Sequence, residues 1–253
     1  MDLTSIRAKG VYPVSSHRAV LHGWRLAFDV HHFFKHEGGM GNIHPSTDPE
    51  DRVLGVVHLC HDEALERLDA VEAYGVGYDR IEIEVVTDTG LIKSTVYVGI
   101  PSFLDPNCLP TTRYLNILIK GALAAELDSD YIDKLRKLDV LQKQTYAPFK
   151  FPDHPDRVFT AECLLKQPHF TALSGAVFDM TGARWEHDYL KGLFGGKDMT
   201  LWHLKRLDTS NGEECIEDVI KQRFNPSQKT YLNEYLHEYN KEYNFAGVFQ
   251  YSN

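Results

Sequence analysis

The side chains with the most evident chemical potential are three histidines near the start of the chain. His31, His32 and His36 lie within six residues, and positions 32 and 36 would be one turn apart in a helix. Neutral imidazole is a common metal ligand. No carboxylate or cysteine completes a set with diagnostic spacing, and Phe33 and Phe34 fit a loop or strand equally well. We therefore assign no metal site here and expect ordinary surface or core histidines.

The cysteines, the glycine-rich segment and the serines do not lie in the sequence motifs that their chemistry would need. The cysteines are scattered without a C-x-x-C pair, so a zinc ribbon and a thioredoxin-type site are excluded and reduced thiols are expected. Residues 195–198, Gly-Gly-Lys-Asp, lack the G-x-x-x-x-G-K-[ST] frame of a phosphate loop. The sequence contains no G-x-S-x-G nucleophile motif, so nothing indicates a serine hydrolase.

Glu72 stands at the end of a segment with helical periodicity. Residues 62–72 place Ala64, Leu65, Leu68 and Val71 on one face, after Asp62 as the expected N-cap, and glycines at 75 and 77 end the pattern. A carboxylate can serve as a general acid or base. A glutamate at a helix end is usually solvated, so its position alone leaves both interpretations open.

The neighbouring elements are expected to form an α+β domain. Residues 53–59 predict a buried strand, and 80–87 with 91–100 predict a hairpin around the turn 88–90. Residues 112–126 and 131–138 predict two helices, the second capped by Asp128, Ser129 or Asp130. The segment 141–157 contains three prolines and predicts a linker. Beyond it we expect short helices, one short strand at 176–179 and a tyrosine-rich helix over about 227–243, with a packed face.

Composition restricts the classes of partner. The 253 residues are 43% hydrophobic and 25% charged, as in ordinary globular proteins, and the formal net charge is -9. Residues 1–150 hold 16 Lys and Arg against 21 Asp and Glu, so neither half is basic. Nucleic acids and anionic membranes are therefore disfavoured as partners. No apolar run reaches the roughly 18 residues of a transmembrane helix and no signal-peptide core is evident, so we expect a soluble, cytoplasmic protein.

Several short motifs follow one another in the first part of the chain. They are Gly23-Trp24-Arg25-Leu26-Ala27-Phe28, Gly41-Asn42-Ile43, Gly55-Val56-Val57, Leu65 with Leu68-Asp69-Ala70-Val71-Glu72, Gly77-Tyr78-Asp79-Arg80, Pro110-Thr111-Thr112-Arg113-Tyr114-Leu115 and Gly121-Ala122. In this order they resemble the γ-glutamylcyclotransferase (AIG2-like) family over roughly residues 1–140. The resemblance implies a small, mostly antiparallel β-barrel with helices. It also implies a lyase that cyclises a γ-glutamyl group to 5-oxoproline and releases an amine or amino acid.

The resemblance also assigns roles to residues. It places the general acid/base at Glu72, and substrate-binding tyrosines at Tyr114 and Tyr78. Packing in the core remains an equal alternative for Tyr114. The partner is then a small γ-glutamyl compound, and the reaction requires no metal or cofactor. The family begins with a strand and a Tyr-Gly-Ser-Asn loop that this sequence does not match, because Met1-Asp2-Leu3 stands just after its place. Either the chain start is assigned too late or half of the site is missing.

A second set of motifs lies between residues 157 and 250. They are Phe159-Thr160, Leu164-Leu165, Leu173-Ser174-Gly175-Ala176-Val177-Phe178-Asp179-Met180-Thr181, Tyr189, Phe194-Gly195-Gly196-Lys197-Asp198 and Tyr243-Asn244-Phe245-Ala246-Gly247. They resemble the cytochrome b5-like haem/steroid-binding family, in its membrane-associated progesterone receptor branch. The resemblance implies a second α+β domain and possible haem binding, with Lys191, Tyr189 and His187 as candidate axial ligands.

The sequence therefore predicts residues 1–140 as a γ-glutamylcyclotransferase-like domain, 141–157 as a linker and 158–253 as a cytochrome b5-like domain. The first hypothesis is an enzyme that acts through Glu72. The alternative is a non-catalytic protein that binds haem or a hydrophobic ligand through its second domain. The sequence leaves the particular γ-glutamyl compound and the oligomeric state open.

Overall fold

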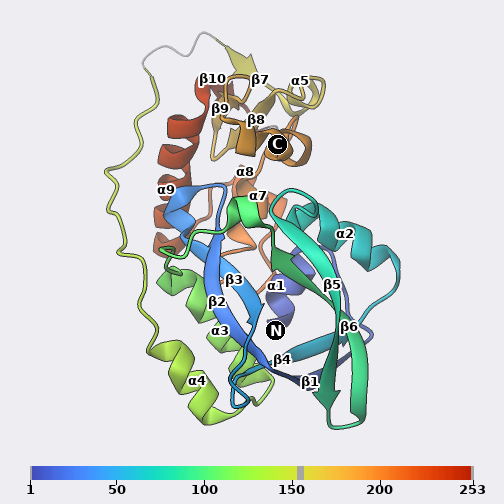
Figure 1. The fold of residues 1–253 in the computed structure, drawn as a ribbon. Helices are drawn as coiled ribbons and strands as arrows, with labels where there is room; N and C mark the ends of the chain where they lie inside the picture. Colours follow the sequence, from blue (N-terminus) through green and yellow to red (C-terminus); the bar gives the residue numbers. More distant parts are fainter. Residues whose placement is uncertain (1, 153–156, 252–253) are drawn as a thin grey trace. The chain divides into compact units, whose positions relative to one another are not determined.

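The computed structural model describes residues 2–152 and 157–251, and the chain divides into two compact units, Met1–Lys143 and Gln144–Asn253 (Figure 1). The division falls inside the segment 141–157 that was assigned to a linker. Positions 153–156 of that segment, with Pro155, lie outside the described residues. No helix in the described ranges is long and apolar enough to cross a membrane.

The first unit is built on antiparallel strands. Its larger sheet has the order β4-β1-β5-β6, with β1 Ser15–His22, β4 Arg52–Leu59, β5 Tyr78–Thr87 and β6 Gly90–Gly99. A second, two-stranded sheet pairs β2 Trp24–His31 with β3 Gly39–Pro45, with a register shift between Ala27 and Val30. The antiparallel arrangement was predicted. The predicted β-barrel is found in part, because the described strands pair as two sheets that form a curled half-barrel.

The hairpin of β5 and β6 confirms the clearest pattern in the sequence. The two strands pair in continuous register from Tyr78 opposite Gly99 to Thr87 opposite Gly90. The turn is closed by the hydroxyl of Thr87, which donates to the carbonyl of Gly90 over 2.9 Å. Gly90 has φ of 118°, a conformation that side chains with a Cβ rarely adopt. Alternating apolar residues and a turn glycine were therefore sufficient to predict this element.

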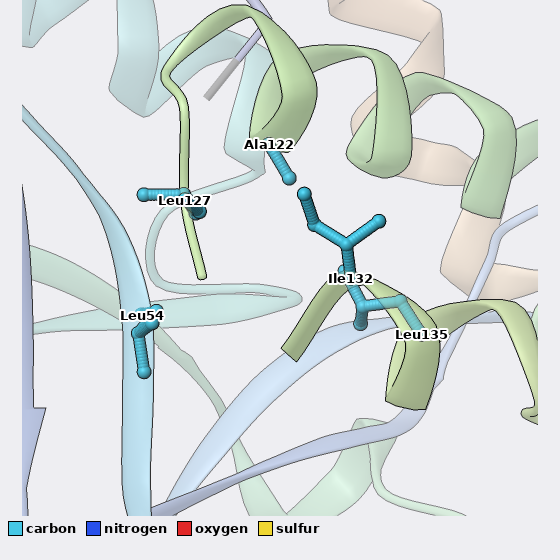
Figure 2. Packing of buried hydrophobic residues seen from close by; sticks show 5 residues of the cluster. All are labelled: Leu54, Ala122, Leu127, Ile132 and Leu135. Carbon is cyan, nitrogen blue, oxygen red and sulfur yellow. The ribbon is translucent and has the colours of Figure 1, made fainter. Parts of the chain in front are cut away.

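The first unit also contains helices. They are α1 Leu3–Ala8, α2 Glu63–Glu72, α3 Thr112–Ala124 and α4 Ser129–Arg136, with 3-10 turns η1 Lys35–Glu37 and η2 Pro101–Phe103. The last two helices pack on β4 through one apolar cluster, shown in Figure 2, of Leu54, Ala122, Leu127, Ile132 and Leu135. The predicted cap of α4 is confirmed at Asp128, whose carboxylate accepts from the amide of Tyr131. Asp62 precedes α2 as predicted but makes no side-chain cap hydrogen bond.

The second unit contains more strands than the sequence suggested. Its elements are β7 Val158–Phe159, α5 Ala161–Leu165, β8 Phe170–Leu173, β9 Ala176–Asp179, η3 Trp185–His187, α6 Asp188–Phe194, α7 Thr200–Leu204, α8 Ile216–Ile220, α9 Pro226–Glu242 and β10 Asn244–Phe249. The predicted strand at 176–179 is confirmed, but it is the third member of a β7-β10-β9-β8 sheet. The expectation of one strand was wrong. The strands β7 and β8, with two and four residues, are too short to display a period of two, and β10, with six residues, pairs with segments far from it in the chain.

The long helix α9 confirms the predicted packed tyrosine face. Asn225 and Gln228 form a reciprocal capping box at its start, with proline at the first turn. Tyr231, Tyr235 and Tyr239 are all buried. Their i, i+4 spacing thus serves the core of this unit.

The described part of the expected linker is bound to α9. The hydroxyl of Tyr146 donates to Glu238 over 2.6 Å, and the amide of Phe149 donates to the side chain of Asn233 over 2.7 Å. The carbonyl of Ala147 accepts from the amide of that same asparagine over 3.0 Å. Prolines exclude regular secondary structure, which is why the segment predicts a linker, and its described part is in contact with α9 through these hydrogen bonds.

Candidate active site

Glu72 is the last residue of α2, where the chain turns sharply. The next residue, Ala73, adopts the left-handed conformation with φ of 53° and is 1% exposed. That conformation costs an alanine roughly 1–2 kcal/mol. Such strain persists only where the surroundings impose it, and it is enriched near functional sites. The left-handed residue ends the helix directly after Glu72.

The carboxylate of Glu72 is paired with the ammonium of Lys9. The two side chains are 23% and 27% exposed, so the ion pair is accessible to water at one side. The residues are 63 positions apart in the chain. Lys9 was not predicted, because a lone lysine between a short helix and a strand carries no pattern.

The end of α1 presents Lys9 in a defined geometry. Lys9 caps the helix, Gly10 follows with φ of 76°, and the amides of Gly10 and Val11 donate to the carbonyls of Arg7 and Ile6. This is the Schellman arrangement of a helix C-terminus. Arg67 of α2 then donates to the carbonyl of Gly10 over 2.9 Å. The lysine is therefore anchored to the same helix that carries Glu72.

Tyr78 and Tyr114 lie on either side of the Gly41 peptide. The hydroxyl of Tyr78 donates to the carbonyl of Gly41 over 3.0 Å, and the amide of Gly41 donates to the hydroxyl of Tyr114 over 3.1 Å. A Cβ at position 41 would lie 2.9 Å from the Tyr114 hydroxyl, which explains the glycine. The structure thus brings together two tyrosines that the resemblance nominated, one from β5 and one from α3.

Both tyrosines are held in the neutral form. Burial raises the pKa of Tyr78 well above its ordinary value, and the negative charges of Glu72 and Asp29 raise it further. Burial also raises the pKa of Tyr114, again with a contribution from Glu72, while the hydrogen bond from Gly41 opposes the shift. These interactions place the Glu72 carboxylate in the electrostatic neighbourhood of both phenols. Neutral phenols can donate hydrogen bonds but cannot act as bases.

A second carboxylate supports the same turn of α2. Asp69 accepts from the hydroxyl of Tyr97 over 2.7 Å and pairs with the guanidinium of Arg80 at 3.2 Å. Burial, followed by the hydrogen bond to Asp69, raises the pKa of Tyr97. The guanidinium of Arg80 also lies 4.3 Å from the centre of the Tyr74 ring. The i, i+3 spacing of Asp69 and Glu72 could have suggested a shared face, but the strand residues that bind Asp69 were not predictable from spacing.

A carboxylate–imidazole pair lies on the smaller sheet and was also missed. Asp29 contacts the Nε2 atom of His44 at 2.6 Å and accepts from the side-chain amide of Asn42 at 2.9 Å. The oxygen of the Asn42 amide accepts from the backbone amide of Gly99 at 3.0 Å. These contacts connect the smaller sheet to the end of β6, beside Tyr78.

The haem-ligand candidates of the second unit are engaged with protein groups. The ring nitrogens of His187, which is fully buried, contact the hydroxyl of Tyr243 and the guanidinium of Arg184, each at 2.9 Å. Lys191 pairs with Asp188 at 2.7 Å. Tyr189 is half-buried on α6. The side chains of His187 and Lys191 thus contact neighbouring protein groups in the structure, and haem binding stays a prediction from the sequence.

The early histidines do not converge on a metal site either. His31 stacks on Phe103 with ring centres 4.5 Å apart, and Nδ1 of His32 accepts from the amide of Phe34 within its own turn. Among the residues that the structure describes, no group of three or more His, Cys, Asp and Glu is arranged to hold a metal ion. All four cysteines are free thiols.

Comparisons with known proteins support the resemblance of the first unit to the γ-glutamylcyclotransferase (AIG2-like) family. Residues 52–135, which contain Glu72, Tyr78 and Tyr114, match the AIG2-like family. The gamma-glutamyl cyclotransferase gliK of Claviceps purpurea is 25% identical over 215 residues, covering 76% of this chain and 96% of its own. Because 76% of 253 residues is about 192, and the first unit spans 143, that similarity extends into the second unit.

Two solved structures match about half of this chain. A gamma-glutamyl cyclotransferase is 24% identical over 54% of this chain and 78% of its own, with a TM-score of 0.46. An uncharacterized human protein is 26% identical over 52% of this chain and 80% of its own, with a TM-score of 0.45. None of these comparisons supports a cytochrome b5-like second domain, which stays a prediction from the sequence.

Proposed function

We propose that the first unit cyclises the γ-glutamyl group of a small substrate to 5-oxoproline and releases the attached amine, with Glu72 as general acid and base. The observation that carries this proposal is the Glu72 carboxylate itself, which is three-quarters buried, paired with Lys9 and within electrostatic reach of two neutral phenols. The match of residues 52–135 to the AIG2-like family supports the same reaction class.

The chemistry is an intramolecular acyl transfer. The α-ammonium of the substrate gives a proton to Glu72, and the freed amine attacks the δ-carbonyl carbon to close a five-membered ring. The bond from that carbon to the departing nitrogen then breaks as Glu72 returns the proton to the leaving amine. The ring nitrogen loses its second proton, which Glu72 passes on in the same way, so the products are the neutral lactam and a protonated amine. A bent substrate supplies the proximity that makes this attack effectively unimolecular. The balance needs no metal and no redox cofactor.

Tyr114 is placed to assist the same step. Its oxygen accepts from the amide of Gly41, and its own O–H has no acceptor among the described residues. In our proposal this O–H donates to the oxygen of the δ-carbonyl as negative charge develops there. Tyr78 cannot do the same, because its proton already goes to the carbonyl of Gly41. It holds that peptide in place instead.

The test is release of 5-oxoproline from a panel of γ-glutamyl amines, amino acids and peptides. We expect Glu72→Gln to lower kcat by about 10²–10⁴-fold, the range for a lost general acid/base. Glu66→Gln is the matched control, since Glu66 lies on the same helix and is exposed. It should retain wild-type turnover. Equal turnover by the Glu72 variant would eliminate the proposed role of this residue.

A further inference from the structure

The ion pair between Lys9 and Glu72 is an unusual feature for a site in which Glu72 is proposed to bind the ammonium group of a substrate. Each side chain is about a quarter exposed. Ion pairs that solvent can reach add little to folding stability, so stability alone gives little reason to fix a lysine here. The fixing is nevertheless thorough, because Val11 behind it is 1% exposed and Arg67 binds the carbonyl of Gly10.

The chemistry of the proposed substrate offers an explanation. A γ-glutamyl group ends in an α-carbon that carries both an ammonium and a carboxylate. A protein site for such a zwitterion needs an anion and a cation side by side, facing the opposite charges of the ligand. Glu72 and Lys9 are that combination, in contact with each other and open to solvent.

We infer that Lys9 binds the α-carboxylate of the substrate while Glu72 binds its α-ammonium, so that Lys9 determines specificity for an unmodified glutamyl head group. This inference rests on the proposed function, because it names the recognition partner of the same carboxylate. On binding, the direct contact between Lys9 and Glu72 is exchanged for two contacts with the ligand. The number of opposite-charge contacts at the site therefore rises from one to two.

The surrounding charges favour this role for Lys9. Asp69, one turn before Glu72, is already paired with Arg80 and bound by Tyr97. Arg67 uses its guanidinium on a backbone carbonyl. Among the ion pairs of the described residues, the only cation in contact with Glu72 is Lys9. The α-carboxylate of a substrate can therefore pair with Lys9, which would give up only its contact with Glu72.

A competing role for Lys9 makes the opposite kinetic prediction. If the lysine merely blocks Glu72, its removal exposes the carboxylate and lowers KM for every substrate. If it binds the α-carboxylate, its removal raises KM only for substrates that have this group. The two roles are separated by one pair of compounds: γ-L-glutamylmethylamide, and the same molecule with its α-carboxylate converted to a carboxamide.

We expect Lys9→Met to raise KM for γ-L-glutamylmethylamide by about 10–100-fold, the effect of losing a charge-assisted hydrogen bond, with a smaller change in kcat. For the carboxamide, the wild type and the variant should have the same KM within about two-fold. Lys9→Arg should preserve most of the discrimination, since it keeps the charge. Arg7→Met is the matched control, because it removes a charge from the exposed end of the same helix without touching Glu72.

A binding measurement keeps the inference testable apart from turnover. Titration calorimetry of γ-L-glutamylmethylamide into Glu72→Gln protein, with and without Lys9→Met, reports the carboxylate contact directly. We expect the added substitution to weaken binding about 10-fold or more. Unchanged binding, a lower KM in Lys9→Met, or equal effects on both compounds would overturn the role of Lys9. Absence of 5-oxoproline with all substrates, while this binding difference persists, would instead overturn the proposed function and leave a γ-glutamyl-binding site.

Discussion

At the scale of single residues, the site depends on side chains that differ greatly in how visible they are in the sequence. Glu72, Tyr78 and Tyr114 could be nominated because they occur in motifs that resemble a known family. Lys9 could not, since its meaning comes from an ion pair with a residue 63 positions away. The left-handed conformation of Ala73 was not predictable either, because alanine rarely adopts it. Residue type and order thus nominated Glu72 and the two tyrosines, but not the residues that contact them.

The proton of Tyr114 gives a prediction at this scale. Tyr114→Phe removes the proposed donor to the developing oxyanion, so we expect kcat to fall by about 10²–10³-fold with 5-oxoproline release as the measurement. It also leaves the amide of Gly41 without its acceptor, which costs about 1–3 kcal/mol in the free energy of unfolding. Tyr78→Phe is the comparison, because its proton goes to a backbone carbonyl. A larger loss of kcat in Tyr78→Phe than in Tyr114→Phe would show that Tyr78, and not Tyr114, is the donor.

At the scale of elements, local patterns predicted what local interactions decide. The hairpin 78–99, the helix before Ala73 and the two helices on β4 all follow from periodicity and turn residues. The pairing of the first unit's strands into two sheets, the additional strands of the second unit and the binding of residues 144–151 to α9 do not. These features depend on pairings between segments far apart in the chain, for which a single sequence supplies no local signal.

Gly99 tests one such pairing. It ends β6 where that strand meets the smaller sheet, and a Cβ there would lie 2.3 Å from Cγ2 of Val30 and 3.2 Å from the amide of Asn42. We expect Gly99→Ala to lower the free energy of unfolding by about 1–3 kcal/mol, as overpacking does, in urea titrations. Gly55→Ala in β4 is the matched control, since its Cβ would meet no atom within 4 Å. Equal stability of the two variants would mean that the sheets are not tightly apposed at this point.

At the scale of the whole molecule, two domains were predicted from the segment 141–157 and from two separate resemblances, and the structure has two compact units. What the second unit does was not predictable to the same degree. Its short elements resemble a cytochrome b5-like family in sequence, yet the nominated ligands His187 and Lys191 are committed to protein partners. A motif records residue types in order, whereas ligand binding depends on which side chains the packing leaves available.

Buried tyrosines in both units give a prediction for the whole molecule. Burial raises the pKa of Tyr78 and Tyr114 in the first unit and of Tyr239 and Tyr243 in the second. In the unfolded chain these phenols lose their protons near pH 10, while the folded chain retains them. The unfolded state therefore binds fewer protons above that pH, and the stabilisation, complete below about pH 10, is lost as the pH rises further. Urea midpoints for both units should fall between about pH 9 and pH 11, and tyrosinate absorbance from the buried phenols should appear together with unfolding. Midpoints that stay constant over this range, with gradual ionisation of these phenols in the folded protein, would contradict the prediction.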